Sequence, residues 1–181
     1  MNKSIIYSNA IISARSGLLL NGDKIRRMMA AQTSADAAKV LFECGFNEPT
    51  TLEAEMTRIN RPEDSSEDWY AITDLSGKII GETGFLRLWR HWHCTDMSMI
   101  IPDPNDQGKG YGFEAGQLMI DRAFGHYNLN RISVGVVELN NPAVKFWERL
   151  GFKKEGIQEQ GYFYNGEYSN FIMMRLLRSE L

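Results

Sequence analysis

The sequence has few cysteines, few prolines and no long run of apolar residues. Its 181 residues include two cysteines, Cys44 and Cys94, which lie far apart with no metal-ligand spacing. This pattern predicts free thiols in a reducing cytoplasm and no disulfide framework. Every apolar stretch falls short of the roughly 20 residues of a membrane-spanning helix, and Ser4 and Asn9 interrupt the N-terminal one, which argues against a signal peptide. We therefore expect a cytoplasmic protein without a membrane partner.

The chain also lacks a large net charge. Lys and Arg number 20 against 23 Asp and Glu, which gives −3 at pH 7 and an isoelectric point near 5.7. A general nucleic-acid binder is usually basic, so this balance argues against a nucleic-acid partner. Hydrophobic residues make up 43% and charged residues 24% of the chain, as in an ordinary soluble globular domain.

An acidic, proline-containing stretch at residues 60–69, NRPEDSSEDW, divides the chain into two parts. Before it, apolar residues recur at helical spacing, which predicts three short helices and no strand. After it, the patterns predict strands and helices in the order ββ–β–α–β–α–ββ. We predict a mostly helical segment over residues 1–62, either separate from or merged with a core over residues 63–181. The core is of the α+β class, with a mixed, mostly antiparallel sheet flanked by helices.

The stretch DPNDQGKGYGFEAG, residues 103–116, packs four glycines between a predicted strand and a predicted helix. A triphosphate-binding loop needs Gly, four residues and then Gly-Lys-Ser/Thr, and a dinucleotide fingerprint needs G-x-G-x-x-G after the first strand of the fold. Neither spacing occurs here. Successive glycines still let several backbone N–H groups approach one anion, and the helix that follows adds the positive end of its dipole. The stretch therefore predicts a phosphate-binding turn of another kind.

With its surroundings, this stretch resembles the GNAT N-acetyltransferase family over residues 67–177. Residues 107–112 match the family motif Q/R-x-x-G-x-G/A, and residues 140–152 match its later asparagine–helix–GF signature. Residues 161–174 look like the branch that holds ribosomal-protein N-terminal and spermidine acetyltransferases. The resemblance implies that the loop cradles the pyrophosphate of acetyl-CoA. The residues assigned to this contact are Gln107, Gly108, Lys109, Gly110, Tyr111 and Gly112.

The resemblance also implies contacts along the rest of the cofactor. The strand before the loop would part from its neighbour and offer backbone groups to the pantetheine arm, which places Met99, Ile100 and Ile101 beside it. Asn140 would hydrogen-bond the pantetheine or the entry of the following helix. Trp147 stands where the family usually has a tyrosine that protonates the departing thiolate, and an indole cannot do so near neutral pH. We expect Trp147 to pack on the cofactor or in the core.

Acetyl transfer to an amine needs a group that takes the ammonium proton and a polarised thioester carbonyl. In many members of the family a glutamate on the strand before the loop takes that proton. The nearest acid here is Asp96, and Glu82 is the second candidate. The acid that protonates the thiolate stays open among Tyr111, Tyr162, Tyr164, a water, or none.

A pair of histidines follows the predicted hairpin strand. His91 and His93 alternate on one face and could ligate a metal, but no convincing third ligand lies nearby, so we predict no metal site. Together with Trp89 and Trp92 they would line a substrate mouth.

The first part of the chain carries a second resemblance. Residues 8–46 are similar to the N-terminal helical segment of the C subunit of V-type ATPases: an Asn-Ala near a Tyr, an Ala-Arg, a Leu-Leu before an acid-led helix, and a second helix that ends in Gly-aromatic. This resemblance implies a helix pair that docks on a partner. The strand with which GNAT members usually begin has no clear counterpart here.

The sequence thus predicts an acetyl-CoA-dependent N-acetyltransferase. It would transfer acetyl directly, in a ternary complex, to the primary amine of a protein N-terminus or a polyamine-like small molecule, and a homodimer is compatible with this. Two alternatives stay open. One is a non-catalytic acetyl-CoA-binding regulatory module, because Trp147 replaces the tyrosine. The other is an assembly component that docks through residues 1–46.

Overall fold

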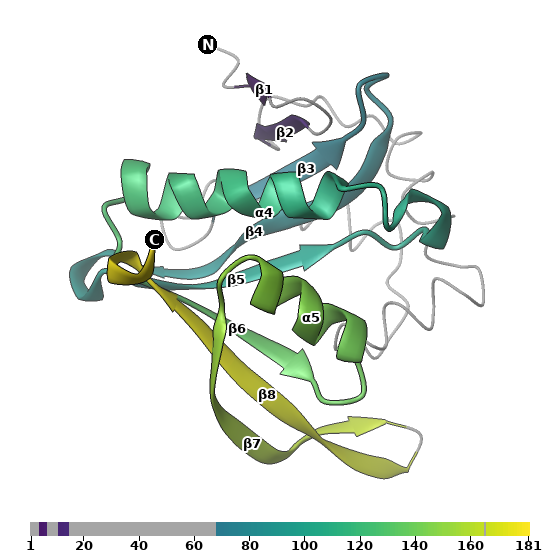
Figure 1. Cartoon of the computed structure of the whole chain (residues 1–181), viewed down its shortest axis with the longest axis vertical. Coiled ribbons are helices and arrows are strands. Elements are labelled where there is room, and N and C mark those ends of the chain that lie inside the picture. The colour runs from purple at the N-terminus through teal and green to yellow at the C-terminus, as the bar shows by residue number, and fades with distance from the viewer. Residues whose placement is uncertain (1–3, 7–10, 15–67, 165) are drawn as a thin grey trace, which may run out of the picture.

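The computed structural model describes residues 4–6, 11–14, 68–164 and 166–181. Within them the chain forms one sheet with helices packed on it (Figure 1). The strands are β1 (Ser4–Ile6), β2 (Ile11–Ala14), β3 (Asp68–Thr73), β4 (Ile79–Trp89), β5 (Cys94–Ile100), β6 (Arg131–Val137), β7 (Lys153–Tyr164) and β8 (Glu167–Leu177). The helices are α4 (Tyr111–Asp121), which continues as a π-helical turn (Arg122–His126), and α5 (Asn141–Arg149). Short 3-10 turns lie at Arg90–Trp92, Pro104–Asp106 and Arg178–Glu180.

The sheet is mixed and mostly antiparallel. Its order is β1-β2-β3-β4-β5-β6-β8-β7, and among the strands that the structure describes only β5 and β6 run parallel. Parallel neighbours need a crossover connection, and α4 provides it here. The prediction of an α+β core with a mixed, mostly antiparallel sheet is confirmed.

The prediction of no strand before residue 60 is wrong at two short stretches. β2 pairs with β3, with Ile11 opposite Thr73 and Ala14 opposite Tyr70, and β1 adds a further strand at the edge. Strands of three or four residues are too short to show a clear alternation, and pairing with an existing strand stabilises them more than intrinsic propensity does. The three predicted helices lie outside the described residues.

A single hydrophobic core joins the helices to the sheet. Phe85 of β4, Met119 of α4, Ile132 of β6 and Met174 of β8 are all fully buried in it. In Figure 1, α4 passes in front of β3 and β4 with β5 running below it, while α5 lies between β5 and β6. Burial of each such side chain contributes about 1.5–3 kcal/mol relative to exposure. The strands and helix ends that carry the site are therefore held by well-packed neighbours.

The parallel strands β5 and β6 separate along their length. They pair only over Cys94–Asp96 and Arg131–Ser133, and no described residue of β6 pairs with β5 beyond Asp96. Figure 1 shows the two strands diverging toward their C-terminal ends, with α5 at the wide end. Backbone N–H and C=O groups are obligatory hydrogen-bonding groups, so the β6-facing edge of Met97–Met99 can bind an extended ligand.

Asp68 at the start of β3 ties the sheet to the end of α4. One carboxylate oxygen accepts hydrogen bonds from the Tyr70 hydroxyl (2.8 Å), the Tyr127 hydroxyl (2.7 Å) and the Arg122 Nε (2.8 Å). The Arg122 guanidinium also lies over the Tyr70 and Tyr127 rings. Burial first, and then the hydrogen bond to Asp68, raise the pKa of Tyr127. The hydroxyl therefore stays protonated and donates.

Replacing Tyr127 by phenylalanine removes one donor from this half-buried carboxylate. We expect the free energy of unfolding to fall by roughly 1–2 kcal/mol, as for other hydrogen bonds to charged groups, without loss of the fold. Urea unfolding of wild type and Tyr127→Phe measures the difference. Tyr168→Phe is the control, because Tyr168 is exposed on β8. Equal stability of Tyr127→Phe and wild type would contradict the importance of this contact.

Candidate acetyl-CoA and acceptor site

The glycine loop ends in a left-handed turn at the start of α4. Gly108 has φ 72° and Gly110 has φ 91°, values that glycine adopts without the steric cost other residues pay. Gly110 is the N-cap residue and supplies no capping side chain, so the first N–H groups of α4 are available to an anion. Residues 108–112 of the predicted loop therefore form a left-handed turn at a helix N-terminus.

The residues before these glycines are tied to their surroundings. Asp103 accepts the backbone N–H of Asn105 at 2.9 Å and caps the turn Pro104–Asp106. Gln107 lies on the loop, but its side-chain amide donates to the Ile101 carbonyl at 2.7 Å. Gln107 thus braces the loop against the end of β5 rather than pointing to a phosphate.

Side chains of β5 and α5 meet at Gly112. A Cβ built on Gly112 would lie 3.5 Å from Phe146 Cε2, 3.6 Å from Ile101 Cδ1 and 3.6 Å from Met99 Sδ. The structure therefore brings Met99 and Ile101 to the loop, on the side of the sheet that α4 covers. Phe146 of α5 joins them, a residue that was not among the predicted site residues because only the fold brings α5 to the loop.

Ile100 lies on the other face of the sheet. Side chains alternate along a strand, so Met99 and Ile100 point in opposite directions. Ile100 is buried and lies opposite Glu82 of β4. Its side chain does not share the surroundings of Met99, and its carbonyl oxygen lies toward Gly81 of β4 rather than toward the gap between β5 and β6. The structure therefore does not support the predicted place of Ile100 beside the pantetheine, and Met99 is the residue of this pair that lies near the loop.

Asn140 begins α5. Its side-chain oxygen accepts the backbone N–H of Ala143 at 3.1 Å, and Pro142 occupies the first turn. Asparagine is among the preferred N-cap residues for this reason. Of the two roles that the sequence suggested, the structure places Asn140 at the helix entry.

Trp147 lies in the core. Its side chain is only 6% exposed, and its ring makes edge contacts with Phe146 at 5.0 Å and Phe152 at 5.1 Å between centroids. Because so little of the indole is open, the geometry favours packing in the core over contact with the cofactor. Phe146 is the neighbour that reaches the loop in its place.

Asp96 lies where β5 and β6 part. It is the last residue of β5 to pair with β6, and it lies opposite Arg87, next to a β-bulge in β4. An Arg87 guanidinium nitrogen lies 2.7 Å from the Asp96 carboxylate, which is partly exposed. From Ile100 to Asp96 the strand covers roughly 13 Å at about 3.3 Å per residue, a length that suits an extended pantetheine arm.

Glu82 occupies a different level of the sheet. It is buried and lies between Ala71 of β3 and Ile100 of β5. Glu82 therefore lies beside the end of β5 that leads into the glycine loop, four residues along the strand from Asp96. The two candidate acids are therefore not brought together, and Asp96 is the one at the parting of the strands.

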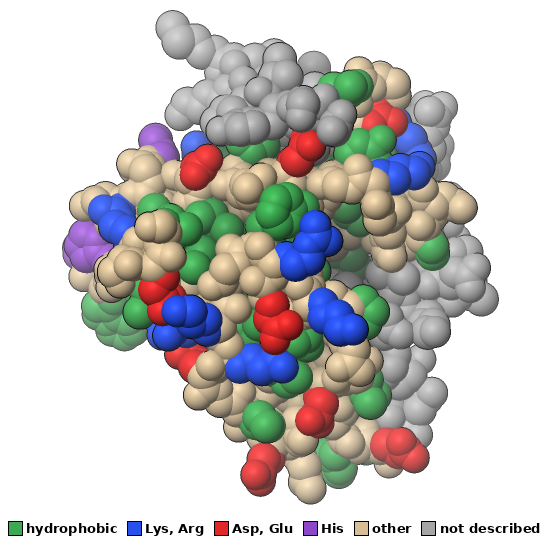
Figure 2. Space-filling model, viewed as in Figure 1, with side chains coloured by type: hydrophobic (Ala, Val, Ile, Leu, Met, Phe, Trp, Pro, Cys, Tyr) green, Lys and Arg blue, Asp and Glu red, His purple; other side chains and the backbone are tan. Residues whose placement is uncertain are grey.

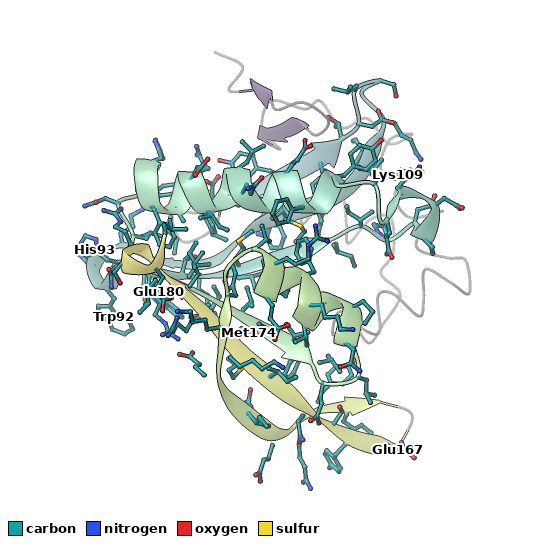
Figure 3. The ribbon with its side chains drawn as sticks, viewed as in Figure 1. Trp92, His93, Lys109, Glu167, Met174 and Glu180 are labelled. Carbon is teal, nitrogen blue, oxygen red and sulfur yellow. The ribbon has the colours of Figure 1, made fainter. Side chains whose placement is uncertain are left out.

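Trp92 and His93, from the stretch that was predicted to line a substrate mouth, lie at the opposite end of the molecule from the loop. Figure 3 shows Trp92 and His93 on one side and Lys109 on the other. His93 Nδ1 lies 2.8 Å from the Asn128 carbonyl oxygen, and Trp92 is 74% exposed beside Trp89. Within the described part of the chain no group of three or more His, Cys, Asp or Glu side chains could hold a metal ion.

Comparison with known proteins identifies the family. Residues 25–152 match the acetyltransferase (GNAT) family. Spermidine N(1)-acetyltransferase of Vibrio cholerae is 29% identical over 117 residues, which cover 65% of this chain and 67% of that protein. Spermidine N(1)-acetyltransferase of Escherichia coli K12 is 28% identical over 137 residues, which cover 75% and 73%. A crystal structure of the Vibrio cholerae spermidine N-acetyltransferase with CoA and spermine has the same fold, with a TM-score of 0.80, 24% identity and coverage of 96% of this chain and 98% of that chain.

The chain therefore belongs to the GNAT family of acetyltransferases. The predicted family, the activity class of acetyl-CoA-dependent N-acetyltransferase and the predicted co-substrate are confirmed. The matched region begins inside the segment 1–62, while the division into segment and core stays a prediction, as does the likeness of residues 8–46 to the C subunit of V-type ATPases. Across the described ranges, no helix has the length and apolar character to cross a bilayer.

Proposed function

We propose that this enzyme transfers acetyl from acetyl-CoA directly to the primary amine of a polyamine-like small molecule, in a ternary complex. The observation that carries the proposal is the gap between β5 and β6 beyond Asp96, which leads to the left-handed glycine turn at the N-terminus of α4. In this proposal the pyrophosphate lies at the turn, the pantetheine arm extends along β5, and the thioester lies near Asp96.

The loop residues Gly108, Lys109, Gly110, Tyr111 and Gly112 would hold the pyrophosphate. Their backbone N–H groups and the dipole of α4 stabilise the negative charge. The β6-facing backbone of Met97–Met99 would pair with the amides of the pantetheine arm, because β6 does not pair with β5 there. The carbonyl of the thioester then lies near the point where the two strands meet.

Asp96 would act on the acceptor. An amine is nucleophilic only when neutral, so the ammonium must lose a proton before attack. In our proposal the Asp96 carboxylate, directly or through a water, takes that proton, and Arg87 at 2.7 Å holds the carboxylate in place. The amine nitrogen forms a bond to the carbonyl carbon, the C–S bond breaks so that the thiolate leaves as CoA, and the nitrogen releases its second proton to water to give the neutral amide.

Protonation of the thiolate has no assigned side chain. Trp147 is buried and its indole does not donate a proton usefully near neutral pH. Tyr162 is buried against Phe171 with ring centroids 5.6 Å apart. Tyr111, in the first turn of α4, is partly exposed but lies at the phosphate end. A thiolate is a good leaving group, so water can protonate it after the C–S bond breaks.

The relatives support the acceptor class. Two proteins with 28–29% identity are spermidine N(1)-acetyltransferases, and the net charge of −3 suits a cationic substrate. On the face in Figure 2, Lys and Arg side chains are interspersed with Asp and Glu, an arrangement unlike the continuous basic stripe that nucleic-acid binding requires.

Thiol release tests the proposal. The purified enzyme is mixed with acetyl-CoA and spermidine, spermine, a short peptide with a free N-terminus, or lysine, and the CoA thiol is followed with a chromogenic disulfide. We expect release with spermidine or spermine well above the other acceptors. Release only with the peptide would move the acceptor to a protein N-terminus. Tight acetyl-CoA binding by calorimetry with no release from any amine would indicate a regulatory module instead.

A further inference from the structure

We propose that the ion pair between Lys78 and Asp106 anchors the acetyl-CoA loop to the β3–β4 hairpin and sets the affinity for the pyrophosphate. The Lys78 Nζ lies 2.6 Å from Asp106 Oδ2. The two residues belong to different elements, and neither was singled out by the sequence. This inference rests on the proposed placement of acetyl-CoA at residues 107–112.

The turn that carries Lys78 is held by hydrogen bonds of its own. Lys78 closes the turn between β3 and β4, where the Asp74 carboxylate accepts the backbone N–H groups of Ser76 and Lys78, each at 2.9 Å. Gly77 has φ 81° in the same turn. Because the turn is braced by its own hydrogen bonds, the Lys78 side chain starts from a fixed position at the edge of the sheet.

Asp106 stands immediately before the loop. It ends the turn Pro104–Asp106 and precedes Gln107 and Gly108, and its side chain is only 10% exposed. A nearly buried carboxylate without a partner costs a desolvation penalty. Lys78 removes that penalty when the loop lies against the hairpin, so the pair favours this one position of the loop.

The two lysines near Asp106 have different roles. Lys78 is surrounded by three acids, Asp106, Asp103 and Asp74, and the hydrogen bond to Asp106 is the largest cause that raises the pKa of Lys78. Its charge is therefore compensated within the protein. Both lysine side chains are about half exposed, but Lys109 lies 3.7 Å from the other oxygen of Asp106, farther than the 2.6 Å of the Lys78 pair. Lys109, between the two left-handed glycines, is free to turn to a phosphate, whereas Lys78 is a positioning residue.

Substitution of Lys78 by methionine tests the anchor. We expect the Kd and KM for acetyl-CoA to rise about tenfold, the effect of losing a hydrogen bond to a charged group. The kcat and the KM for the amine should stay near wild type. S-acetylpantetheine has no pyrophosphate, so the preference for acetyl-CoA over S-acetylpantetheine should fall by the same factor. Lys78→Arg should restore most of the affinity.

Variants of Asp106 and Lys109 distinguish a residue that anchors the loop from a residue that binds the phosphate. Asp106→Asn should weaken acetyl-CoA binding to a similar extent, and the double variant with Lys78→Met should be no worse than either single variant. Lys109→Met should instead weaken binding with a shallower salt dependence, because it removes a charge that faces the phosphate. Tighter binding by Asp106→Asn would show that the aspartate only repels the phosphate, and would overturn the proposal.

Lys153→Met is the matched control. It breaks an exposed lysine–acid pair of the same kind, Lys153–Glu180 at 2.9 Å, and Figure 3 places Glu180 far from Lys109. We expect wild-type affinity and activity from it. Lys78→Met with unchanged affinity, alongside normal binding by wild type, would refute the anchor alone. No acetyl-CoA binding by wild type itself would refute the proposed cofactor site. Thermal unfolding of each variant identifies any that fails to fold.

Discussion

Asp96→Asn is expected to lower kcat by at least about 100-fold, with the KM for acetyl-CoA unchanged. Proton transfer by a positioned side chain contributes roughly 10²–10⁴ to the rate, and an amide cannot accept the proton. Asp96 lies at the parting of β5 and β6, at the far end of β5 from the glycine loop, so cofactor binding should not change. Steady-state thiol release at saturating amine and varied acetyl-CoA measures both quantities.

Two further variants decide whether the effect belongs to the Asp96 carboxylate. Arg87→Met removes the 2.7 Å ion pair but keeps the carboxylate, and we expect a much smaller loss of kcat. Glu82→Gln changes the buried acid at the loop end of the sheet and should also cost less than Asp96→Asn. If Glu82→Gln abolished turnover while Asp96→Asn kept it, the proton acceptor would be Glu82.

Gly112→Asp should weaken acetyl-CoA binding strongly, with a loss of stability that a thermal melt measures separately. A Cβ at Gly112 meets Phe146, Ile101 and Met99 at 3.5–3.6 Å, an ordinary contact distance, so alanine fits there. A carboxylate beyond this Cβ meets apolar side chains, which lowers stability, although an acid in the first turn of a helix offsets part of that cost. A carboxylate about 4 Å from a phosphate, however, costs on the order of 4 kcal/mol per pair of charges at an effective dielectric constant near 20. Binding should weaken by at least about 100-fold.

Calorimetric titration with acetyl-CoA and a thermal melt measure the two effects of Gly112→Asp separately. Gly112→Ala is the control for volume, and we expect it to bind within a fewfold of wild type. Gln117→Asp adds the same charge on the exposed side of α4 and should bind normally. Unaltered affinity of the Gly112→Asp variant would mean that the pyrophosphate does not lie at this turn.

The predicted strands and helices of the core agree with the structure because their patterns are local. Alternation in residues 79–89 and the β-branched run in residues 131–137 each indicate a strand without reference to the rest of the chain. The helix α5 carries its own start signals, Asn140 and Pro142. The short strands β1 and β2 have no such local signal, since pairing with β3 is what makes them strands.

Within the site, the loop was predictable and its supports were not. The spacing of Gln107, Gly110 and Gly112 predicts the turn at the start of α4, which the structure contains, and its role in binding phosphate stays a prediction. The Lys78–Asp106 pair joins residues that are far apart in the chain, so only the fold shows it. The alternation of β5 also separates Met99 from Ile100, which a list of consecutive residues could not reveal.

By itself, the sequence determined the family, the order of elements in the core and the position of the glycine turn before α4, because glycine spacing and side-chain periodicity act over a few residues. The tertiary structure decided which acid lies at the parting strands, where Trp147 packs and what holds the loop. Those questions depend on the register between strands and on contacts between distant segments. Register places Asp96 opposite Arg87 and Glu82 opposite Ile100. This pairing between strands cannot be predicted from the local sequence pattern of either strand.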